Sequence, residues 1–244
     1  MAGLFKEKPM TLILFIPAFI LTLASAFADV RATGEALDIS SVRSVVISGD
    51  ASDIRLTTRG AGPYRATTSA RRGGWFSSWY SSWFFNGCRD RNAMRIDGAV
   101  LKIQVMQTSW TDLSDCTPEV SANLAPGTIV RIDQQAVRAQ LDGDFASVAI
   151  ASKAADITFH GHATGIDILG TAVRAQLRYD TIRQDETVSI TAQSLQADLN
   201  FGSGVPLDYS VIAKASYVDS LEPSVSGAKP RVSIKGDYVH ARIR

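Results

Sequence analysis

Three histidines, His160, His162 and His240, are the side chains of this 244-residue chain best suited to acid–base or metal chemistry. His160 and His162 stand two residues apart, so both rings can point to one side of a strand. A metal site needs a third or fourth ligand, and none follows at a usual spacing. We therefore interpret both as histidines of a surface turn and predict no metal site, no cofactor and no catalytic residue.

Carboxylate pairs occur at three places: Asp112 with Asp115, Asp142 with Asp144, and Asp185 with Glu186. Glycoside cleavage needs two acids facing one sugar bond, and lyases need clustered Asp, Lys or Arg. Phosphate loops, dinucleotide fingerprints and the repeated Gly and Asp of calcium-binding nonapeptides are absent from the sequence. A carbohydrate-active lyase or hydrolase remains the alternative to a non-catalytic protein.

Residues 72–92 form the most unusual stretch of the chain, an aromatic insertion rich in Trp, Phe, Tyr and Ser. Its rings recur every four residues, which would place them on one face of a short helix. We predict that this face, with the arginines beside it, binds a ligand or partner. The predicted contact residues are Trp75, Phe76, Trp79, Tyr80, Trp83, Phe84, Arg71, Arg72, Arg89 and Arg91.

Charge is unevenly distributed, although 25 Lys and Arg against 24 Asp and Glu give the whole chain a formal charge of +1. Residues 55–95 contain eight arginines and one aspartate. Near-neutrality of the whole argues against a protein built to bind nucleic acid. The basic aromatic region instead suits an envelope glycan, an anionic membrane surface or a protein partner. Alternatively, the aromatic face caps an open end of the β structure.

Residues 1–28 have the pattern of a cleaved signal peptide. Lys6 and Lys8 precede an apolar run, and Ala26 and Ala28 supply a small-residue cleavage site. No later segment is long and apolar enough for a transmembrane span. We predict an exported protein, periplasmic or at the cell surface or outside the cell, with residues 29–244 forming one β domain. In an exported chain the two cysteines, Cys88 and Cys116, are expected to form a disulfide that joins the aromatic insertion to an irregular segment at 108–118.

The elements expected to position these residues are short β-strands, because apolar and polar residues alternate from about residue 42 onward. The hexapeptide at 136–141 recurs unchanged at 172–177, and the sequence between follows a nine-residue period. Two apolar columns result: Ala139, Val148, Ile157, Ile166 and Ala175; and Leu141, Ile150, Phe159, Ile168 and Leu177. The same period predicts an outward column: Arg138, Ser147, Asp156, Gly165 and Arg174.

This pattern predicts an all-β fold. Equal spacing favours a single-stranded β-solenoid, or β-helix, of roughly nine-residue strand–turn units, two units to a coil. An antiparallel β-sandwich is the alternative.

Strands that lead into Gly-Asp turns, as in 46–56, 141–144 and 234–239, resemble the bacterial "putative adhesin" family of exported β-solenoids of unknown function. The resemblance extends over about residues 42–244 and is interrupted at 72–92 and 108–118. It implies a solenoid in the cell envelope or at the cell surface and no catalytic residues. The sequence thus predicts a non-catalytic binding or structural module.

Overall fold

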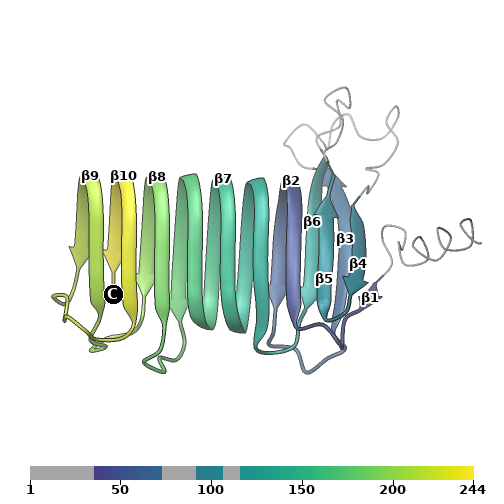
Figure 1. Cartoon of the computed structure of the whole chain (residues 1–244), viewed down its shortest axis with the longest axis horizontal. Coiled ribbons are helices and arrows are strands. Elements are labelled where there is room, and N and C mark those ends of the chain that lie inside the picture. The colour runs from purple at the N-terminus through teal and green to yellow at the C-terminus, as the bar shows by residue number, and fades with distance from the viewer. Residues whose placement is uncertain (1–35, 73–91, 107–115) are drawn as a thin grey trace, which may run out of the picture. The chain divides into compact units, whose positions relative to one another are not determined.

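The computed structural model describes residues 36–72, 92–106 and 116–244, and these are almost entirely β-strand (Figure 1). The strands are β1 (Leu37–Asp38), β2 (Ser44–Thr57), β3 (Arg65–Arg72), β4 (Ala93–Asp97), β5 (Val100–Val105), β6 (Cys116–Asn123), β7 (Thr128–Tyr179), β8 (Thr187–Asn200), β9 (Asp208–Ser220) and β10 (Arg231–Ile243). The described residues contain no helix, which confirms the predicted all-β class.

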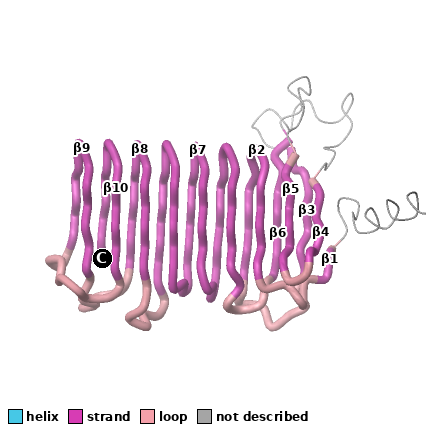
Figure 2. Tube along the Cα trace, viewed as in Figure 1, coloured by secondary structure: helices cyan, strands magenta, loops and turns pink. Residues whose placement is uncertain are grey.

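The strands form a mixed sheet in which long strands pair in parallel (Figure 2). β7 pairs in parallel with β2 on one side and with β8 on the other, and β10 pairs in parallel with β8 and β9. Antiparallel pairing joins β3 to β1 and β6, and β4 to β5. This arrangement is not the antiparallel sandwich considered as an alternative, because successive long strands run in the same direction.

Both apolar columns predicted from the nine-residue period are buried. Ala139 and Ala175 have no exposed surface, and Phe159 is 1% exposed. Outward and inward side chains alternate along β7, as the pleat requires. The apolar columns therefore form the core, together with the matching residues of β2, β8 and β10.

Close backbone contacts inside β7 join residues 18 positions apart. A Cβ atom on Gly161 would lie 2.0 Å from the carbonyl oxygen of Gly143, and one on Gly170 would lie 2.6 Å from the carbonyl oxygen of Ser152. Two nine-residue units therefore separate neighbouring passes of the chain.

The order of the last strands differs from their order in the sequence. β10 lies between β8 and β9, so β9 forms the edge at that end of the strand order (Figure 1). At the other end, the long strand β2 pairs along its first half with β5 and along its second half with β6. In the described part of the chain, no helix is long and apolar enough to cross a membrane.

Candidate functional site

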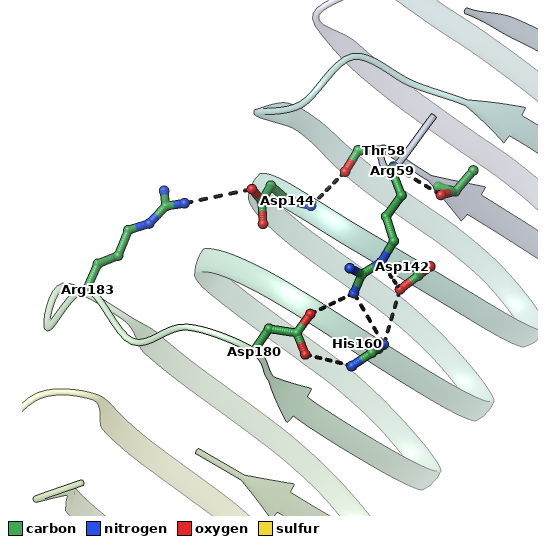
Figure 3. Close-up of polar contacts among 8 residues, drawn as sticks. Thr58, Arg59, Asp142, Asp144, His160, Asp180 and Arg183 are labelled. Carbon is green, nitrogen blue, oxygen red and sulfur yellow. Dashed lines mark hydrogen bonds and ion pairs between the residues drawn. The ribbon is translucent and has the colours of Figure 1, made fainter. Parts of the chain in front are cut away.

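Arg59, immediately after β2, connects side chains from two passes of β7 and from its end (Figure 3). Its guanidinium donates to Asp142 and to Asp180, each at 2.7 Å. His160 lies between the same two acids, with Nδ1 3.3 Å from Asp142 and Nε2 2.6 Å from Asp180. We call Arg59, Asp142, His160 and Asp180 the arginine cluster.

The electrostatics of the arginine cluster favour a structural tie over an acid catalyst. The hydrogen bond from Arg59 is the main cause that holds the pKa of Asp180 below its ordinary value, and His160 lowers it further. A glycosidase acid needs the opposite shift, because it must remain protonated at working pH. Asp180 is instead held ionised and paired, which argues against the enzyme alternative at this position.

A groove of about 1110 Å³ runs across β2, β7, β8, β10 and β9. One row across the strands consists of small residues and is interrupted by Tyr238, which lies between Ser194 and Ala215: Ala51, Ala136, Ala154, Ala172, Ser194, Tyr238 and Ala215. The other side carries polar and charged side chains: Asp53, Arg138, Asp156, Arg174, Gln196 and His240. Seven adjacent passes, from Asp53 to Tyr217, span roughly 29 Å at the usual strand spacing. We call this feature the small-residue groove.

Aromatic rings gather at the β9 end of the small-residue groove. Tyr238 is 67% exposed and Tyr217 is 64% exposed, although both lie on strands. The imidazole of His240 packs edge-on against the ring of Tyr217, with centroids 5.2 Å apart. Exposed rings beside hydrogen-bonding groups provide stacking and polar contacts at once.

Charges along the groove wall alternate in sign. Asp53 lies opposite Arg138 in the strand register, and Arg138 is 3.9 Å from Asp156. The next charged residue along the wall is Arg174, followed by the neutral Gln196. The wall therefore offers donors and acceptors without the dense acid pair that glycoside cleavage uses.

Two smaller hollows flank His160, one of about 570 Å³ and one of about 510 Å³. The first is lined by residues of β2, β3, β6 and β7, and the second by residues of β7 and β8. Gln140 and Thr158 line the first, while Thr158 and Gln176 line the second. The hollows thus follow the strip of outward polar side chains beside the small-residue groove.

Most residues of the predicted aromatic site lie outside the described residues. These are Trp75, Phe76, Trp79, Tyr80, Trp83, Phe84, Arg89 and Arg91, and the same holds for Cys88 and for the signal peptide at 1–28. Arg71 is in β3, with its side chain 73% exposed and 3.9 Å from Glu119. Arg72 ends β3 and lies opposite Cys116, the first residue of β6. Ligand binding through this region and the Cys88–Cys116 disulfide both stay predictions.

The interpretation of both histidines as surface-turn residues is right about the exposure of His160 alone, and both residues lie within strand β7 rather than in a turn. His160 is 45% exposed along its side chain, as expected of a surface position. His162 is only 2% exposed, and its Nε2 lies 3.2 Å from Glu186 Oε1. His162 is therefore not a surface residue, because the segment between β7 and β8 places Glu186 against its ring.

Sequence reasoning did not identify Arg59, Asp180, Tyr217 or Tyr238 as site residues. Arg59 is 83 residues from Asp142 and 121 from Asp180, so no local spacing relates them. One signal was present in the sequence: the nine-residue period breaks after Tyr179, at the start of the segment that contains Asp180 and Glu186.

The fold and the groove together define an all-β protein with a mixed sheet and an extended polar surface on its strands. No family model matches the sequence, and no curated protein matches it. Two of the solved structures that match this chain share little of its sequence and have TM-scores below 0.5. One, from Clostridium sporogenes, is described as a "putative cell adhesion protein"; it is 8% identical, with a TM-score of 0.41, over 88% of this chain and 100% of that one. The other, a "putative adhesin" from Bacteroides fragilis, is 8% identical, with a TM-score of 0.43, over 87% of this chain and 96% of that one.

Proposed function

We propose that this protein is a non-catalytic, adhesin-like binding module, exported to the periplasm or the cell surface, that holds an extended glycan in the small-residue groove. The observation that carries the proposal is the groove itself. The groove crosses adjacent strands. Along it, a row of mainly small side chains runs beside a row of side chains whose charges alternate, and exposed tyrosines lie at its β9 end. An extended polar polymer fits this shape better than a compact metabolite does.

Strand spacing supports a polymer ligand. Equivalent side chains on neighbouring passes repeat about every 4.8 Å, which is close to the length of one pyranose residue. A glycan lying across the strands can therefore meet a similar set of donors and acceptors at each sugar. Tyr217 and Tyr238 provide faces on which a terminal sugar can stack.

We also infer that the scaffold is a β-solenoid. Parallel pairing of β2, β7, β8 and β10, contacts between residues 18 apart, and a core of two apolar columns all support this inference. In a solenoid each coil adds one pass to the groove, so the groove lengthens with the number of coils.

The aromatic insertion remains a second proposed contact, for an anionic glycan, a lipid headgroup or a protein partner. Its support is the sequence alone: six regularly spaced rings among arginines. Deleting residues 74–86 tests this contact independently of the groove.

The experiment that tests the proposal is a glycan and lipid binding screen of the exported chain, run beside a hydrolase and lyase panel. The variant Ala154→Trp places a large ring on the groove floor at an exposed strand position. The matched control is Thr191→Trp, an exposed β8 residue outside the groove. Strands tolerate Trp at outward positions, so both variants should fold.

We expect Ala154→Trp to weaken binding of the selected glycan at least tenfold, while Thr191→Trp binds as the unmodified chain does. Equal binding by both variants would exclude the groove as the site. Turnover of a glycan in the panel, retained in Ala154→Trp, would favour the enzyme alternative.

A further inference from the structure

The segment between β7 and β8 departs from the repeat of the strands around it. Residues in neighbouring passes of β7 are 18 apart, whereas Gly165 of β7 pairs with Thr187 of β8, a separation of 22. The additional residues lie in the 180–186 segment, which contains Asp185 and Glu186. Gln184 in the same segment has a φ of 63°, a left-handed conformation that is unfavourable for a residue with a side chain.

This segment brings two carboxylates next to His162. One ligand atom each of His162, Asp185 and Glu186 lies within 4.8 Å of the other two. His162 is 2% exposed and Glu186 is fully buried, whereas Asp185 is exposed. Oε1 of Glu186 lies 3.2 Å from His162 Nε2 and accepts a hydrogen bond from the backbone N–H of Arg183.

The second oxygen of Glu186 has no hydrogen-bond partner, although it is buried. The hydroxyl of Tyr179, whose ring packs edge-on to that of His162, is also buried without a partner. Burying an unpaired carboxylate oxygen costs several kcal/mol, so such atoms usually have a partner in the native protein. The orphaned carboxylate oxygen of Glu186, which belongs to the same side chain that contacts His162, is the observation that points to a bound group here.

Among the residues that the structure describes, no Lys or Arg side chain forms an ion pair with Glu186. The guanidinium of Arg183, the nearest in sequence, extends to Asp144 at 3.8 Å (Figure 3).

We propose that His162, Glu186 and Asp185 form a binding site for a divalent transition-metal ion of the Zn²⁺ type. Glu186 is held at two points: its side chain accepts from the backbone N–H of Arg183, and its backbone carbonyl accepts from the N–H of Arg231 at 3.0 Å. The exposed Asp185 can rotate toward the ion and marks the path by which it enters.

The donor set selects the kind of metal. One imidazole nitrogen with two carboxylates suits Zn²⁺ and its neighbours, whereas Ca²⁺ and Mg²⁺ prefer oxygen ligands alone. Ligands of a tetrahedral Zn²⁺ stand roughly 3.3 Å apart, because each lies about 2.0–2.1 Å from the ion. The 3.2 Å between His162 Nε2 and Glu186 Oε1 already matches this spacing. Water or a ligand group would complete the coordination.

The test is metal binding by the exported chain, purified without a histidine tag and dialysed against a chelator. Calorimetric titration with Zn²⁺, and the visible absorption of bound Co²⁺, measure binding without any assumption about glycans. The variants are Asp185→Asn and Glu186→Gln. The control is His160→Gln, which removes the exposed imidazole two residues away and leaves the proposed ligands in place.

We expect one Zn²⁺ per chain, about tenfold or more weaker binding in Asp185→Asn, loss of the Co²⁺ absorption in Glu186→Gln, and unchanged binding in His160→Gln. Excess Ca²⁺ should not compete. Because Asp185 is exposed, Asp185→Asn should fold even if Glu186→Gln does not. Absence of Zn²⁺ binding to the unmodified chain, or equal affinity in Asp185→Asn, would overturn the proposal. Neither result bears on glycan binding in the groove.

Discussion

Replacing Gly161 with alanine tests how closely neighbouring passes of β7 stack. Gly161 has a φ of 137°, and an added Cβ would lie 2.0 Å from the carbonyl oxygen of Gly143. Because that oxygen belongs to the backbone, the clash with the added Cβ can be relieved only if the two passes of β7 move apart. The Gly161 carbonyl also accepts from the N–H of Asp180 at 2.9 Å, which links the same position to the following pass.

Gly202 provides a matched control, because it also has a positive φ, 93°, but its added Cβ would meet nothing within 4 Å. Gly202→Ala should cost only the conformational penalty, about 1–2 kcal/mol. Gly161→Ala adds a backbone clash, and overpacking of a tight interior costs about 1–3 kcal/mol more. The two variants should therefore differ by about 1–3 kcal/mol in the free energy of unfolding.

Urea unfolding followed by circular dichroism measures both variants. With a slope of about 2 kcal/mol per molar, the midpoint of Gly161→Ala should lie about 0.5–1.5 M below that of Gly202→Ala. Equal slopes would show that the folded states remain comparably compact. If the two midpoints coincide, the close contact between Gly161 and Gly143 does not contribute to stability and the stacking argument fails.

Three further variants test the core and the arginine cluster. Phe159 is 1% exposed and lies between the rings of Phe145 and Tyr179. Phe159→Ala should therefore lower the free energy of unfolding, measured in urea, by about 3–5 kcal/mol, and Phe159→Leu should lower it clearly less. Equal losses in the two variants would show that the surrounding core collapses around either side chain. Arg59→Gln should cost at most about 1 kcal/mol for each of its exposed ion pairs, because solvent screens them. The pKa of Asp180 is lowered in the folded protein. The contribution of its ion pair with Arg59 to the free energy of unfolding is therefore fully present above the unfolded pKa of about 3.9 and is lost as pH falls through the folded pKa. The stability difference between the unmodified chain and Arg59→Gln should thus shrink as pH falls from about 5 to below about 4; a difference that grows over this range would contradict the assigned role.

The break in the nine-residue period was a better guide to the surroundings of His162 than the spacing of the two histidines was. His160 and His162 are two residues apart in sequence, yet one is exposed and the other is buried against Glu186. Their spacing could not show this, because the burial of His162 depends on a segment more than twenty residues away. The interruption of the period after Tyr179 marks that segment in the sequence itself.

Repeat spacing predicted the strands but not which units share a surface. Arg138, Asp156 and Arg174 line one groove, whereas Ser147 and Gly165 of the same predicted column do not. Alternate nine-residue units therefore face different surfaces. The outward column follows the nine-residue period, whereas neighbouring passes of β7 stack residues 18 apart, so alternate members of the column lie on different surfaces.

The sequence by itself determined the all-β class and the two buried columns, because strand pleating has a period of two and fixes inward and outward residues locally. Only the tertiary structure decided that Arg59 reaches Asp142 and Asp180, that β10 lies between β8 and β9, and that Glu186 closes over His162. These contacts join residues 24 to 121 positions apart, or depend on strand order. Their positions follow from how passes stack on one another, which local alternation does not encode.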